Sequence, residues 1–183
     1  MGVLCPSFFH EGVNMKTTRT TKLSHGAVIA AVYVAMCFFL KPISYGPVQL
    51  RLSEALCVLP IFMPEAVYGL FIGCFLSNLL GGASVALLDT ILGSLTTLLA
   101  AYLTRQIFVK TKSWWLALMP PVILNALIVG SYVPFIYQSA TQGSIFVILA
   151  YSIASVFIGE TLAVYAIGLP FGKALAKTNI FKC

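Results

Sequence analysis

The sequence predicts an all-α membrane protein, a bundle of six transmembrane helices with both termini in the cytoplasm. The first observation is composition: of 183 residues, 60% are hydrophobic and only 9% are charged, whereas a soluble domain carries roughly 25% charged residues. The second is the arrangement of the apolar residues in six segments joined by short polar connections. The third is that the basic residues cluster in alternate connections, as topology signals do.

The N-terminal part predicts a cytoplasmic tail, residues 1–23, followed by a first helix at 24–40. The tail has no apolar region ending in a cleavage site, so we expect no cleaved signal peptide. Met15 is followed by KTTRTTKLS, a typical lead into a first span, so either Met1 or Met15 is the expected start.

The first helix carries a face of small residues, because alanine recurs at every fourth position: Ala27, Ala31 and Ala35. Such a face lets another helix approach closely within lipid, so we interpret it as a partner interface. The alternative is that alanine is simply common in membrane helices.

The stretch 46–80 is apolar yet interrupted by proline and by charged residues. Residues 42–50 predict an irregular loop, since they contain two prolines and a glycine. We expect two short helices, 50–63 and 64–80, with Pro64 in the first turn of the second. Fourteen helical residues cover only about 21 Å against about 30 Å of hydrocarbon, so two crossings require that the first begins inside a protein-lined or water-filled mouth.

Three longer segments complete the predicted bundle, at 84–108, 114–137 and 144–169. The Pro120-Pro121 pair must disturb the fifth helix, because proline lacks the N–H of a helical residue. We therefore expect one six-helix membrane domain over 24–175 and a cytoplasmic tail over 176–183.

The charges test this topology. Six crossings place the N-terminus, the connection near 105–112 and the C-terminus in the cytoplasm, and each of these regions holds three of the eleven lysines and arginines. If residues 50–80 formed only one crossing, the cluster at 105–112 would lie outside, against the positive-inside rule. The charge pattern therefore favours six crossings and a multi-pass protein of the cell membrane.

Several functions are not expected. The chain has no P-loop, HExxH, GxSxG or CxxC motif, so no ATP hydrolysis, metal site, cofactor or catalytic centre is predicted. The basic clusters are topology signals, so no nucleic-acid partner is expected. The five cysteines show no paired spacing, and we interpret them as small apolar residues.

Polar residues inside apolar segments mark the candidate substrate-binding site, because such residues are costly in a membrane and usually functional. The predicted topology brings them from five helices to a shared depth in the outer half of the bundle. They are Arg51, Glu54, Asn78, Asp89, Asn125 and Glu160.

Carboxylates, amides and nearby aromatic rings suit a flat ring that is cationic or rich in hydrogen-bond donors. One carboxylate can accept two N–H bonds from a guanine-like edge, and a second could hold an amine. The alternatives are that Arg51 and Glu54 pair with each other, and that Asn78 and Asn125 make interhelical hydrogen bonds.

The run GPVQLRLSEALCVLPIFMPEAVYGLFIGCFLSNL resembles the QueT family of queuosine-precursor transporters, which are S components of energy-coupling factor (ECF) transporters. The likeness continues through LLDTILGSL, PPVILNALIVG and GETLAVYAIGLP, and it covers about residues 22–175. GPVQLRLSEAL is its most specific part.

The resemblance implies a substrate-binding S component that captures a 7-deazaguanine such as preQ1 and delivers it to an energising module. That module comprises a transmembrane coupling protein and two cytoplasmic ATPases, and the alanine face would contact the coupling protein. Within this picture we expect Asp89 or Glu160 to bind the purine-like edge, and Glu54 to bind the amine or pair with Arg51. The alternatives are an S component for another vitamin or nucleobase, a solitary proton-coupled secondary transporter, or a small intramembrane enzyme.

Overall fold

The computed structural model describes residues 19–40, 51–81, 86–136 and 144–178, and every regular element in these ranges is a helix. The α-helices are α1 (Arg19–Phe39), α3 (Ala66–Gly81), α4 (Ala86–Leu88), α5 (Ser94–Thr111), α6 (Trp114–Ala117), α7 (Met119–Leu124), α8 (Gly130–Ile136), α9 (Ile145–Thr161) and α10 (Leu169–Lys177). A 3₁₀ helix, η2 (Leu52–Ile61), and three π-helical segments, η3 (Asp89–Gly93), η4 (Asn125–Val129) and η5 (Leu162–Gly168), complete the fold.

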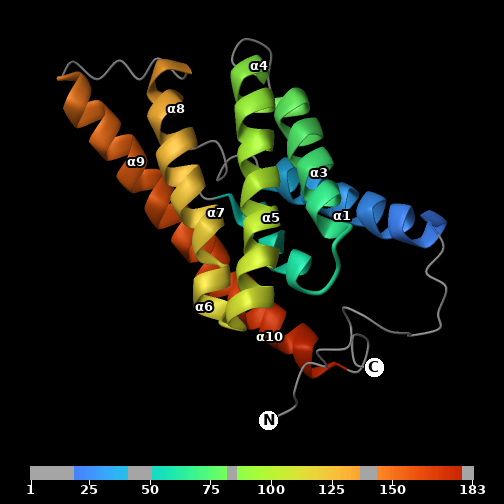
Figure 1. Cartoon of the computed structure of the whole chain (residues 1–183). Helices are drawn as coiled ribbons and strands as arrows, with labels where there is room; N and C mark the ends of the chain where they lie inside the picture. The colour runs from blue at the N-terminus through green and yellow to red at the C-terminus, as the bar shows by residue number, and fades with distance from the viewer. Residues whose placement is uncertain (1–18, 41–50, 82–85, 137–143, 179–183) are drawn as a thin grey trace.

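The helices form a bundle, with α4 and α8 at one end and α6 and α10 at the other (Figure 1). Within the described ranges, four helical stretches are long and apolar enough to cross a membrane: Arg19–Phe39, Asp89–Thr111, Trp114–Phe135 and Ile145–Lys177. Two shorter apolar helices, Leu52–Ile61 and Ala66–Gly81, occupy the positions expected for the second and third crossings. The predicted six-helix, all-α architecture fits these elements, and the protein is a multi-pass membrane protein.

The second helix differs from the prediction because η2 is a 3₁₀ helix of ten residues rather than an α-helix of fourteen. It spans about 20 Å at about 2.0 Å per residue. Eight of its ten residues are buried, so it forms the middle of the bundle and touches little lipid. Its C-terminal end is fixed by Arg105, whose guanidinium donates to the Pro60 carbonyl at 3.0 Å.

Each of the three long helices after α3 contains a π-helical segment, which the sequence did not predict. π-segments are rare and frequently lie at functional sites. The last one also explains why the final helix continues through Pro170 to Lys177, beyond the predicted end at 169. The wider turn of η5 precedes the proline and accommodates a ring that would otherwise clash with the preceding turn. The double proline behaves as predicted, since α6 ends at Ala117 and Pro120-Pro121 open α7.

Helix α1 packs against α3 through glycines. A Cβ atom built on Gly69 would lie 2.6 Å from the Gly26 carbonyl oxygen, and one built on Gly73 would lie 2.7 Å from the Cβ of Tyr33. The two backbones therefore approach so closely that only glycine fits at both positions, which is how small residues allow helices to associate in lipid. Ala27, Ala31 and Ala35 lie on a different face of α1 and are exposed.

We expect Gly69→Ala to lower the free energy of unfolding by about 1–3 kcal/mol, because its methyl group meets backbone that cannot move aside. Gly26→Ala is the matched control, since its added Cβ would sit at an ordinary 3.6 Å from the Glu65 carbonyl oxygen. Equilibrium unfolding in mixed detergent micelles measures both changes. Equal stability of the two variants would contradict the close α1–α3 contact.

Candidate substrate-binding site

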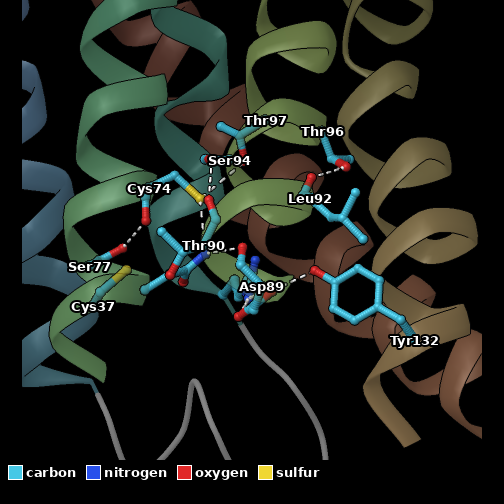
Figure 2. Close-up of polar contacts among 12 residues, drawn as sticks. Cys37, Cys74, Ser77, Asp89, Thr90, Leu92, Ser94, Thr96, Thr97 and Tyr132 are labelled. Atoms are coloured by element: carbon cyan, nitrogen blue, oxygen red, sulfur yellow. Dashed lines mark hydrogen bonds and ion pairs between the residues drawn. The ribbon is translucent and has the colours of Figure 1, made fainter. Parts of the chain in front are cut away.

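A buried ion pair joins the start of η2 to the first π-segment. The Nη2 atom of Arg51 lies 2.8 Å and 3.1 Å from the two carboxylate oxygens of Asp89, and both side chains are almost fully buried. The Tyr132 hydroxyl, from α8, donates to the same carboxylate at 2.6 Å (Figure 2). The amide of Asn78, from α3, donates to the Asp89 carbonyl at 2.9 Å. Asp89 thus ties four elements together.

The π-segment that carries Asp89 is itself held by hydroxyl groups. Ser94 donates to the Thr90 carbonyl, and Thr96 donates to the Leu92 carbonyl at 2.7 Å (Figure 2). These bonds satisfy backbone groups in the region where the helix leaves its regular pattern. The polar face of α5 therefore fixes the backbone beneath the carboxylate.

A second carboxylate, Glu54, is fully buried and already has three donors. The Tyr33 hydroxyl of α1 donates at 2.6 Å, the Cys57 thiol at 2.9 Å and the Thr97 hydroxyl of α5 at 3.2 Å. Burying a carboxylate is unfavourable unless its oxygens are hydrogen-bonded, and here both are. Three hydrogen bonds from neighbouring side chains therefore hold the Glu54 carboxylate in place.

The third carboxylate, Glu160, is fully buried, and neither of its oxygens has a hydrogen-bond partner among the described residues. Asn125, the first residue of η4, is also fully buried, and its side chain interacts with Glu160, although neither side chain makes a hydrogen bond of standard geometry to a described residue. Arg51 and Glu54 lie within electrostatic range of Glu160, and the Nη1 atom of Arg51 is unpartnered as well. Buried polar groups in native proteins are nearly always paired, so these unpaired side chains stand out from the rest of the bundle interior.

The six predicted site residues are thus all buried and form one polar cluster in the bundle interior. They do not play equal parts. Arg51 pairs with Asp89, so the predicted alternative that it pairs with Glu54, three residues away, is wrong. Glu54 instead bonds to Tyr33, because the 3₁₀ helix directs it toward α1. Asn78 makes the interhelical hydrogen bond considered as its alternative role.

Sequence reasoning missed Tyr33, Cys57 and Thr97, which hold Glu54. The sequence predicts Cys57 as a small apolar residue, but its thiol donates a hydrogen bond to Glu54. Threonine and tyrosine are common in membrane helices, so nothing in the sequence marked these two. Of the aromatic residues near the outer loops, Tyr132 contacts the cluster through its hydroxyl group, while Phe135 is exposed; Tyr45 and Tyr137 lie outside the described residues.

Ionisable groups buried inside a multi-pass helical bundle are typical of membrane transport proteins. Comparison with known proteins places the chain within that class. The family model described as "QueT transporter" matches residues 23–177, so the chain belongs to the QueT transporter family. The resemblance seen in the sequence is confirmed, and the family consists of transporters rather than enzymes.

A curated relative is the "Queuosine precursor transporter QueT" of Lactococcus lactis subsp. cremoris (strain MG1363). It is 36% identical over 100 residues, which is 54% of this chain and 57% of the relative. The chain therefore matches somewhat over half the length of that protein. No solved structure matches the chain.

Proposed function

We propose that the protein is the substrate-binding S component of an ECF importer in the cell membrane, and that it captures a queuosine precursor, a 7-deazaguanine such as preQ1. Membership of the QueT family supports the class, and the name of the relative supports the substrate. The observation that carries the proposal is the pair Asn125 and Glu160, whose four side-chain polar atoms are buried and make no standard hydrogen bond within the described part of the chain. A flat ring rich in N–H donors and carbonyl acceptors would satisfy them.

The charge pattern supports an orientation with both termini in the cytoplasm. Lys110 lies in the last turn of α5 and Lys112 follows that helix, while Lys173 and Lys177 lie in α10, so these exposed cations gather toward the end of the bundle formed by α6 and α10. The positive-inside rule places that end in the cytoplasm. The opposite end, with α4 and α8, then faces outward, and Asp89 lies near it as the first residue after α4.

Binding calorimetry on the purified protein tests the substrate. The proposal predicts saturable binding of preQ1, and saturable binding of another vitamin without any of a 7-deazaguanine would overturn it. Uptake into vesicles that lack the ATPases would instead favour a solitary proton-coupled transporter. Turnover of a substrate by the isolated chain would favour an intramembrane enzyme.

The alanine face of α1 (Ala27, Ala31 and Ala35) is the proposed interface with the coupling protein of the energising module. It is exposed while another face of α1 packs on α3, so it is free to receive a further helix.

We expect Ala31→Trp to bind substrate normally but to lose association with the coupling protein and its two ATPases, because the indole keeps the partner helix away. Val147→Trp is the control, since Val147 is 66% exposed on α9. Co-purification with the tagged energising module measures the effect. Equal recovery of both variants would contradict the assignment of the interface.

A further inference from the structure

A group of exposed lysines lies at the end of the bundle formed by α6 and α10 (Figure 1). None of these lysines makes an ion pair with a described residue, because the described aspartates and glutamates are buried or, at Glu65, half-buried against His25. The positive charge of the group is therefore open to a partner outside the chain. We call this group the lysine cluster; its members are Lys110, Lys112, Lys173 and Lys177.

Two aromatic side chains indicate how deep this end of the bundle lies in the membrane. The rings of Trp115 and Tyr165 stack with their centroids 5.1 Å apart and their planes at 20°, and the Tyr165 hydroxyl donates to the Trp115 carbonyl at 2.8 Å. The Trp115 side chain is nevertheless 61% exposed. Exposed tryptophan and tyrosine side chains prefer the boundary between hydrocarbon and headgroups. The pair therefore marks that boundary at α6 and η5.

The length of the last helix agrees with this depth. Ile145–Lys177 is one helical stretch of 33 residues, which covers about 50 Å at about 1.5 Å per residue. Even at a tilt of about 40°, it rises about 38 Å and exceeds the roughly 30 Å of hydrocarbon. The part from Ile145 to Tyr165 already covers about 30 Å, so the excess falls in α10. Helix α10 therefore carries Lys173 and Lys177 out of the hydrocarbon and into the headgroup region.

Apolar side chains accompany the lysines, and they favour a lipid partner over an acidic protein in water. Phe171, two residues before Lys173, is 41% exposed, and Leu116, four residues after Lys112, is 48% exposed. At a membrane boundary such side chains reach the acyl chains, while the long lysine side chains extend their ammonium groups to lipid phosphates. Clustered lysines at this depth attract anionic headgroups in particular.

We propose that the lysine cluster binds the headgroups of anionic phospholipids, with Trp115 and Phe171 in contact with the acyl chains of the same lipids. This end of the protein then gathers anionic lipid from a mixed bilayer. The inference concerns a surface outside the substrate site and does not depend on which substrate is carried.

Tryptophan fluorescence tests the inference, because Trp114 and Trp115 are the only two tryptophans of the chain and both lie beside the lysine cluster. The full chain is reconstituted in vesicles of phosphatidylcholine and phosphatidylglycerol, one of which carries brominated acyl chains that quench tryptophan. Comparing the two labelled lipids gives their relative binding constant next to the tryptophans. We expect phosphatidylglycerol to be preferred at least about fivefold at low salt, and less at high salt because the charges are screened.

Two matched double variants locate the effect. Lys112→Gln/Lys173→Gln should reduce the preference for phosphatidylglycerol to about twofold or less, since each lysine contributes about fivefold near an anionic surface. Arg19→Gln/Lys22→Gln removes the same charge from exposed positions of α1, which lies away from α6 in Figure 1, and should keep the wild-type preference.

Three results would overturn the inference. The first is equal quenching of the wild type by the two lipids, and the second is an equal loss of preference in both double variants. The third is a wild type without lipid preference whose Lys112→Gln/Lys173→Gln variant fails to co-purify with the energising module. In that case the lysine cluster binds an acidic protein surface instead.

Discussion

Replacing Arg51 with alanine is expected to lower the free energy of unfolding by about 3–5 kcal/mol, the largest effect on stability that we expect in this protein. The guanidinium is the only cation bonded to Asp89 among the described residues, and both side chains are buried, at 9% and 6% relative exposure. Removing it leaves an unpaired carboxylate between η2, α5 and α8. Equilibrium unfolding in mixed detergent micelles measures the loss.

The matched control for Arg51→Ala is Lys173→Ala, at an exposed cation of α10. The double variant Arg51→Ala/Asp89→Ala should be more stable than Arg51→Ala alone, because it removes the stranded charge along with its partner. A single variant as stable as the wild type, or a double variant less stable than both single variants, would contradict the buried ion pair.

Replacing Glu160 with methionine should weaken substrate binding while the free energy of unfolding stays the same or rises, in contrast to Arg51→Ala. The proposed substrate loses its charge-assisted hydrogen bonds, so affinity for preQ1 should fall by at least about 1.5 kcal/mol. In the absence of ligand, the variant removes a buried carboxylate that has no partner, which should raise the free energy of unfolding by about 1 kcal/mol. Calorimetry and unfolding, measured on the same preparation, give the two changes.

Glu65→Met is the matched control for Glu160→Met, because Glu65 lies outside the polar cluster and contacts His25 at 3.2 Å. It should bind preQ1 normally. If Glu160→Met instead unfolds readily and keeps its affinity, Glu160 has a structural role and the substrate lies elsewhere.

The sequence predicted the number and order of the helices well, because apolar length and basic clusters act over whole segments. It also identified the six buried polar residues, since any ionisable group within a long apolar run is conspicuous. The sequence could not predict which side chains these six residues contact. Arg51 and Asp89 are 38 residues apart, and Tyr33 and Glu54 come from different helices, so no local spacing marks either contact.

The departures from regular α-helix could not be predicted from the sequence for a related reason. The 3₁₀ helix η2 and the three π-segments arise from packing within the bundle, and no composition signal distinguishes them from ordinary α-helix. Yet these segments place the site. Asp89 and Asn125 are each the first residue of a π-segment, and Glu160 lies two residues before the first residue of the third π-segment. Sequence reasoning therefore weights Asp89 and Glu160 equally, whereas the contacts pair Asp89 with Arg51 and Tyr132 and give Glu160 no standard hydrogen bond among the described residues.

The central claim, that Glu160 binds a 7-deazaguanine within the membrane, is tested most directly by identifying what co-purifies with the protein from its native membrane. Denaturation of the wild-type protein should release a 7-deazaguanine that mass spectrometry detects. Glu160→Met, purified in parallel, should release none. Release of a different vitamin from the wild type, or of equal amounts of a 7-deazaguanine from both preparations, would contradict the claim.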